Sequence, residues 1–194
     1  MSKADLVYQY AKYKLEGLQS KEEMSAATRG ILAALRRGIG KAPGELPELW
    51  GMLFDWINDD LVGKDGPSNA EWAVYTALTL YALHQQSNTK PMHKEGVSIG
   101  TAAAGLVEQE EDTPRILKRL HLIATAVSPE DLAYHLRGVV TLLRTKEIAL
   151  DYARLAKELF LFHTEEYGNS IRLAWGRDFY REKYHDTEKE DDTP

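Results

Sequence analysis

The chain of 194 residues contains no cysteine, which excludes disulfide bonds and thiolate metal sites. Long apolar runs are also missing. The longest, Trp72 to Leu83, is interrupted by threonines and is shorter than the ~20 residues of a membrane-spanning helix. The first residues contain no apolar segment typical of a signal peptide. Together these absences predict a soluble, cytoplasmic protein with no membrane partner.

Signals of a β-sheet are equally scarce. No segment alternates apolar and polar residues for the length of a strand, and neither an Asn-Gly turn nor a fixed repeat occurs. Helix signals recur instead, and we predict an all-α fold of eight or nine helices with no sheet. The expected helices span Ala4–Leu18, Ser25–Arg37, a segment from Pro47, Ser68–His84, Ser98–Val107, Thr113–Ala126, Ser128–Thr145, Asp151–His163 and Ser170–Tyr184.

Residues 1–186 are expected to form one domain. The polar loop at residues 85–96 is the expected seam between an N-terminal bundle, residues 1–90, and a C-terminal bundle, residues 96–186. Residues 187–194 are polar and acidic, so we predict a disordered tail there.

Several helix starts have recognisable caps. Ser68 and Glu71 have the spacing of a capping box, and Thr113-Pro114 and Ser128-Pro129 each place a capping residue before a proline. Pro47 occupies a first helical position, followed by an apolar stripe of Leu49, Trp50, Leu53, Phe54 and Ile57. We therefore expect Trp50 to be buried and its replacement by alanine to cost about 3–5 kcal/mol.

The stretch LRRGIGKAPGELPELW, residues 35–50, resembles a phosphate-binding loop only superficially. Leu35 stands where the motif needs its first glycine, and Ala42 stands where it needs a serine or threonine for magnesium. Both flanks are predicted helices, whereas the motif follows a strand. Gly38 and Gly40 can instead adopt the positive φ that ends a helix.

Other catalytic constellations are incomplete. The acidic run at residues 58–60 with Asp65 lacks the spacing of a magnesium motif and has no second acidic partner. No two histidines are four residues apart, as a helical zinc site requires, and no Gly-x-Ser-x-Gly elbow occurs. We expect no enzymatic activity, no metal and no cofactor.

Charge is unevenly distributed. The formal net charge is −6, yet residues 115–181 carry 11 Lys/Arg against 8 Asp/Glu. Helical spacing groups Arg115, Lys118 and Arg119 in one stripe, and Arg137 and Arg144 in another. Such clusters favour contacts with a phosphate backbone. The candidate nucleic-acid-binding residues are Arg36, Arg37, Arg115, Arg119, Arg137 and Arg144.

Five segments in order resemble the CasB family, the small subunit of the type I-E CRISPR surveillance complex, Cascade. They are LRRGIGKAPGELPELW (35–50), GVSIGTAAAGL (96–106), TPRILKRLHLI (113–123), LAYHLRGVVTLLRTKEIALDYARLAKEL (132–159) and WGRDFY (175–180), and the resemblance spans roughly residues 20–182.

The resemblance implies a non-catalytic, all-α subunit present in two copies within the complex. Its partners would be the other Cascade subunits, the backbones of guide RNA and target DNA, and a second copy of itself. It would support the guide RNA–target heteroduplex and hold the displaced DNA strand, in antiviral defence. The six candidate arginines lie in the matching segments, whereas the net charge of −6 argues against strong binding of free nucleic acid.

Two alternatives remain. A TetR-type transcriptional regulator has this length and class, but the link of about nine residues after Arg37 is too long for a helix-turn-helix. An interaction scaffold with no nucleic-acid role would suit the acidic net charge. Weak, salt-dependent nucleic-acid binding would distinguish a CasB protein from such a scaffold.

Overall fold

The computed structural model describes residues 1–19 and 25–191 and confirms the all-α prediction for them. Within these ranges there are nine α-helices and three short 3-10 helices, and no strand; His93 and Leu150 form an isolated bridge. The helices are α1 (Lys3–Gln19), α2 (Ala26–Arg37), η1 (Pro47–Leu49), α3 (Trp50–Phe54), η2 (Asp59–Leu61), α4 (Asn69–His84), α5 (Ile99–Ala104), η3 (Glu110–Asp112), α6 (Thr113–Ala124), α7 (Pro129–Thr145), α8 (Tyr152–Phe162) and α9 (Gly168–Asp191).

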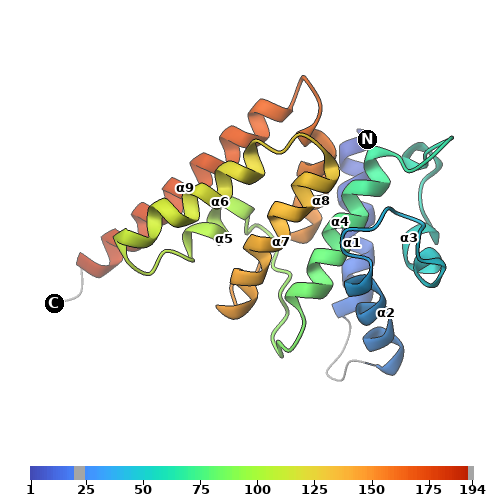
Figure 1. Ribbon diagram of the computed structural model, residues 1–194, viewed down its shortest axis with the longest axis horizontal. Helices are drawn as coiled ribbons and strands as arrows, with labels where there is room; N and C mark the ends of the chain where they lie inside the picture. Colours follow the sequence, from blue (N-terminus) through green and yellow to red (C-terminus); the bar gives the residue numbers. More distant parts are fainter. Residues whose placement is uncertain (20–24, 192–194) are drawn as a thin grey trace.

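Helix α4 lies at the centre of the molecule (Figure 1) and packs against α1, α2, α7 and α8. Its sequence is apolar on all sides, and thirteen of its sixteen residues are buried. A helix without a polar face is stable only when other helices surround it. The composition of α4 therefore explains its central position.

The buried core continues across the loop at residues 85–96. Helix α8, from the second half of the chain, packs against both α1 and α4 from the first half. Helix α9 continues to Asp191, past residue 187, where the tail was expected to begin. The rest of that expected tail lies outside the described residues. No helix in the described part of the chain has the length and apolar character needed to cross a membrane.

Close packing joins α5 to α9. A Cβ atom added to Gly100 would lie 2.1 Å from the backbone oxygen of Trp175, so only glycine fits at this position. The neighbouring small residues of α5, Ala102 and Ala103, are buried. Small side chains let two helix backbones approach closely, and here they allow α9 to pack directly against α5.

Most of the predicted caps are present. Ser68 and Glu71 form a complete capping box, and the Ser128 side chain accepts a hydrogen bond from the backbone N–H of Asp131. The predicted cap at Thr113 is wrong. Thr113 is the first residue of α6, and its buried hydroxyl has no partner among the described residues. The chain enters α6 directly from η3, so Thr113 already has helical backbone angles and cannot cap.

The prediction that Trp50 belongs to the core is also wrong. Its side chain is 53% exposed, and its Nε1 donates to the carbonyl of Gly44 at 3.0 Å. Leu49, the last residue of η1, and Leu53 of α3 are both buried, and they lie four residues apart on one side of the continuous η1–α3 turn. Trp50 is rotated by about 100° from Leu49, since a helix has 3.6 residues per turn. It therefore faces solvent.

Gly38 ends α2 for a different reason than predicted. Its φ is −77°, in the right-handed region, and only Gly40 has the expected positive φ, +82°. The Tyr75 hydroxyl donates to the Gly38 carbonyl at 2.7 Å, and a Cβ on Gly38 would lie 2.4 Å from that hydroxyl. Gly38 is needed because α4 approaches the chain closely at this point.

Candidate nucleic-acid interface

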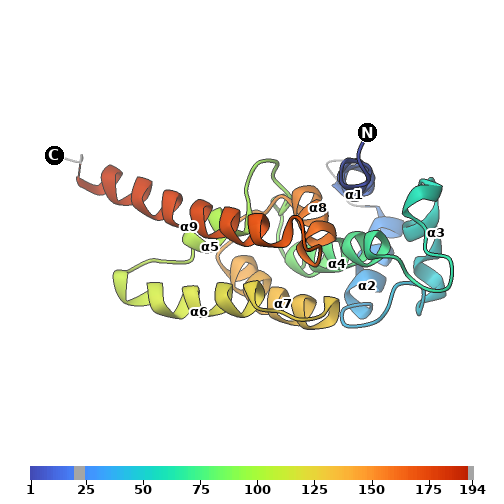
Figure 2. The same ribbon diagram turned by 90° about the horizontal axis from the view of Figure 1, so that it is seen from above.

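Three helices that carry the candidate arginines lie along one side of the molecule. Figure 2 shows α2, α6 and α7 along its lower edge and α1 along the opposite edge. These three helices contain eight lysines and arginines against two carboxylates, a balance of +6 in a chain whose net charge is −6. We call the cationic side of these three helices the basic face. The fold therefore places these positively charged helices on one side of the molecule, which the negative net charge of the chain does not reveal.

The six predicted arginines fall into three pairs on this face. Arg36 and Arg144 come from α2 and α7 and both reach the carboxyl end of α4. Arg36 Nη1 donates to the carbonyl of Ala82 at 3.4 Å, and Arg144 Nη1 donates to Gln86 Oε1 at 3.1 Å. The carboxyl end of a helix carries partial negative charge, which these cations offset. Part of their role is therefore structural.

Arg37 and Arg115 are exposed but paired with carboxylates. Arg37 Nη2 lies 2.7 Å from Glu48 Oε1, and Arg115 Nη2 lies 2.7 Å from Asp112 Oδ1. The hydrogen bond from Arg115 lowers the pKa of the Asp112 carboxyl. Exposed ion pairs of this kind contribute little stability and can exchange partners. Each carboxylate nonetheless offsets the positive charge that its arginine brings to the face.

Arg119 and Arg137 line an open groove between α6 and α7 of about 580 Å³, which we call the α6–α7 groove. No hydrogen bond or ion pair holds either guanidinium within the described part of the chain. A Cβ on Gly138 would lie 3.3 Å from Arg119 Nη1, so the Arg119 side chain passes closely over α7 at this glycine. The structure thus brings together two arginines that lie eighteen residues apart.

Sequence reasoning missed two residues of this groove, Tyr134 and Gly138. Tyr134 is 73% exposed although it lies in the middle of an amphipathic helix. Its position three residues before Arg137 places the two side chains on the same helix face, which was a usable signal. Gly138 gave no signal, because its role depends on the approach of Arg119 from another helix.

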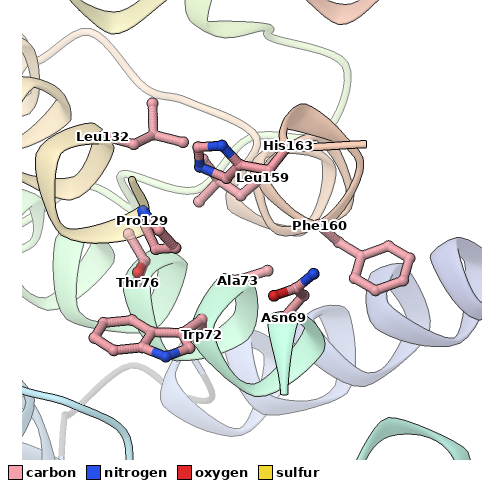
Figure 3. A pocket seen from close by; sticks show the side chains of 9 residues that line it. All are labelled: Asn69, Trp72, Ala73, Thr76, Pro129, Leu132, Leu159, Phe160 and His163. Carbon is pink, nitrogen blue, oxygen red and sulfur yellow. The ribbon is translucent and has the colours of Figure 1, made fainter. Parts of the chain in front are cut away.

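A cavity lies where α4, α7 and α8 meet, with Trp72, Leu132 and Leu159 among its nine lining residues (Figure 3). The space left inside is about 20 Å³, enough for a water molecule and not for a substrate. Among the described residues, no group of three or more histidines and carboxylates is placed to hold a metal ion.

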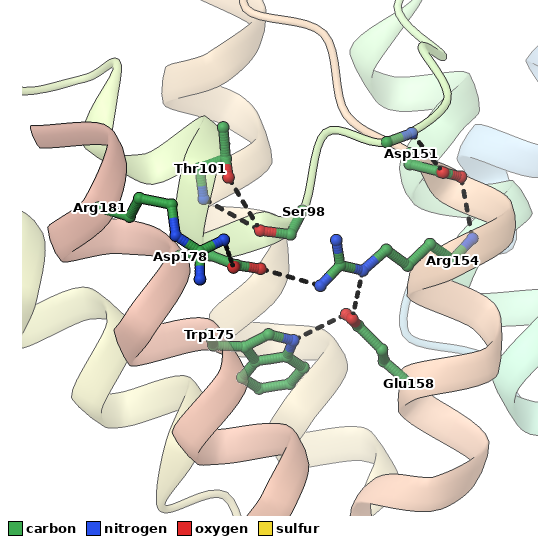
Figure 4. Close-up of polar contacts among 9 residues, drawn as sticks. Ser98, Thr101, Asp151, Arg154, Glu158, Trp175, Asp178 and Arg181 are labelled. Carbon is green, nitrogen blue, oxygen red and sulfur yellow. Dashed lines mark hydrogen bonds and ion pairs between the residues drawn. The ribbon is translucent and has the colours of Figure 1, made fainter. Parts of the chain in front are cut away.

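A second charged cluster, which we call the α8–α9 junction, is partly buried (Figure 4). Arg154 donates to Glu158 at 2.6 Å and to Asp178 at 2.9 Å, and Trp175 Nε1 donates to Glu158 at 2.7 Å. Burial raises the pKa of the Glu158 carboxyl, while Arg154 and the Trp175 N–H oppose that rise. The cluster joins α8 to α9, and its charged groups are paired with one another, so its role is structural.

Comparisons with known proteins identify a family and related structures. The family model described as CRISPR-associated protein Cse2 matches residues 31–180. CasB from Thermobifida fusca is 34% identical, with a TM-score of 0.77 over 90% of this chain and 97% of that one. A Cse2-family protein from Thermus thermophilus is 23% identical, with a TM-score of 0.65 over 93% of this chain and 99% of that one.

A chain of a structure described as a CRISPR RNA-guided surveillance complex has the same fold. It is 20% identical, with a TM-score of 0.67 over 94% of this chain and 98% of that one. A comparison with curated proteins gave no match. The resemblance inferred from five sequence segments is therefore confirmed by the family model over residues 31–180 and by the similarity to CasB from Thermobifida fusca over 90% of the chain.

Proposed function

Since this chain belongs to the Cse2 (CasB) family of CRISPR-associated proteins, we propose that it is the non-catalytic small subunit of a type I-E Cascade surveillance complex. In this role it supports the guide RNA–target heteroduplex and the displaced DNA strand, alongside a second copy of itself and the other subunits. Family membership leaves the TetR-type regulator without a supporting observation.

The basic face carries this proposal. Three helices with a combined charge balance of +6 lie along one side of a chain of net charge −6 (Figure 2), and such an uneven distribution favours contact with a polyanion at that side. In RNA-guided complexes, base pairing reads the sequence, whereas protein contacts the backbone. The contacts of this subunit are therefore electrostatic and independent of target sequence.

The three arginine pairs contribute unequally to the proposed contacts. Arg119 and Arg137, which lack a partner in the described structure, bring a full charge each. Arg36 and Arg144 are partly engaged with the end of α4. Arg37 and Arg115 are paired with Glu48 and Asp112, so a phosphate contact either breaks that ion pair or brings the carboxylate close to the phosphate. In both cases fewer counterions are displaced from the phosphates.

The test compares complexes assembled with wild-type or variant subunits, using a fully matched target across a salt series. The double variant Arg119→Ala/Arg137→Ala should bind more weakly and lower the salt slope by about two, because each lost phosphate contact removes about one counterion. The matched control, Arg37→Ala/Arg115→Ala, removes the same formal charge from ion-paired positions and should change the slope less.

Thermal unfolding of each variant subunit provides the folding control, since exposed charges contribute little stability. Parallel slopes and equal affinities for the wild-type and the Arg119/Arg137 variant would contradict the proposed backbone contact. That outcome would favour an interaction scaffold with no nucleic-acid role.

A further inference from the structure

The α6–α7 groove has a feature that phosphate contacts alone do not explain. Its eight lining residues include Tyr134, Arg119 and Arg137, and none of the eight is acidic. Tyr134 is 73% exposed, so the fold gains little from burying its ring. An exposed aromatic ring between unpaired cations is the combination that binds nucleic-acid strands.

The neighbours of Tyr134 leave room beside it. The next turn of α7 contains Gly138, which has no side chain to fill the groove, and the Arg119 guanidinium lies over that glycine. His135 packs edge-on against the Tyr134 ring at 5.3 Å and is itself held by Asp131, 3.2 Å away. Tyr134 therefore stands on a supported helix face, beside an open space flanked by two arginines.

We infer that the α6–α7 groove binds an unpaired nucleobase, which stacks on the Tyr134 ring while Arg119 and Arg137 contact the neighbouring phosphates. The inference rests on the proposed function, because it specifies which nucleic acid this part of the basic face receives. Bases inside a duplex are already stacked on one another and present no free face to a side chain. A single strand exposes its bases, and aromatic side chains take them regardless of sequence.

Binding of the full-length protein to three probes tests this inference. The probes are a short oligodeoxythymidylate, an abasic strand of the same length and a DNA duplex of the same length, all at low salt. Tyr134→Ala should weaken binding to the oligodeoxythymidylate by about 5- to 150-fold, which corresponds to the ~1–3 kcal/mol of one base stacked on an aromatic ring. Tyr134→Phe keeps the ring and should bind like the wild-type protein.

Two further results are expected if the ring binds a base. Tyr134→Ala should leave binding to the abasic strand and the duplex unchanged, and it should not alter the salt slope, since no phosphate contact is lost. Tyr13→Ala is the matched control, because Tyr13 is an exposed tyrosine on α1 and does not line the α6–α7 groove. Its loss should therefore leave binding to all three probes unchanged.

The outcomes separate this inference from the proposed function. If Tyr134→Ala binds the oligodeoxythymidylate as tightly as wild-type protein, while Arg119→Ala/Arg137→Ala lowers the slope, stacking is overturned and the backbone contact stands. If Tyr134→Ala weakens binding to all three probes equally, the ring serves the shape of the groove and stacking is again overturned. If wild-type protein binds none of the probes, this inference fails, whereas binding by the assembled complex still tests the proposed function.

Discussion

Arginine side chains occupy two contrasting places in this molecule, the α8–α9 junction and the basic face. At the junction, Arg154 is enclosed between Glu158 and Asp178, whose side chains are both largely buried. On the basic face, Arg119 and Arg137 border an open groove and form no ion pair with any described residue. The same residue type therefore stabilises the fold in one place and remains available for a partner in the other.

The difference follows from solvent access. In water, a guanidinium is well solvated and an ion pair contributes at most about 1 kcal/mol. In the interior, a charge that has lost its partner is costly, because nothing replaces the missing interaction. Substitutions at the junction should therefore change stability, and substitutions on the basic face should change binding.

The largest effect is expected for Glu158→Ala. This change removes the acceptor of both Arg154 and the Trp175 N–H in a buried setting, and it should lower the free energy of unfolding by about 3–5 kcal/mol. Chemical denaturation measures the loss. Glu158→Gln keeps an acceptor and should cost less. A loss below about 1 kcal/mol for Glu158→Ala would show that the junction behaves like a surface ion pair.

A smaller effect is expected from the titration of His84. Its ring is fully buried, its Nδ1 lies 2.8 Å from the Tyr152 hydroxyl, and burial lowers its pKa from 6.5 to about 4. Between those values the unfolded chain binds a proton that the folded chain does not. The free energy of unfolding should therefore fall by about 3 kcal/mol as the pH drops from about 6.5 to about 4.

Denaturation of wild-type protein and His84→Asn at several pH values isolates this contribution. Asparagine retains a hydrogen-bond acceptor for Tyr152 but does not titrate, so the variant should lose less stability over this interval. Equal pH dependence in the two proteins would show that His84 does not titrate as its burial requires.

The smallest effect is expected for Trp50→Ala. Because the ring is half exposed, its loss should cost less than about 1 kcal/mol, mainly through the hydrogen bond to Gly44. Thermal unfolding measures this change. A loss of about 3–5 kcal/mol in the free energy of unfolding would contradict the exposed position and support the buried one that the apolar stripe predicted.

Interactions within a few residues of one another were determined by the sequence alone. The capping box of Ser68 and Glu71 and the cap of Ser128 each need only residues three apart, so a short stretch encodes them completely. The apolar composition of α4 likewise predicts a helix that other helices must surround. The family resemblance was equally readable, because it depends on the order of short segments.

Tertiary structure alone decided which side chains face solvent and which charges are neutralised. Trp50 is exposed because the short η1–α3 segment presents Leu49 and Leu53 to the core. Arg36 meets Ala82, and Arg119 meets Gly138, across distances in the chain that no local pattern encodes. All six candidate arginines looked alike in the sequence. Only their packing against α4, Glu48, Asp112 or an open groove distinguishes them, because the energy of a charge depends on what surrounds it in space.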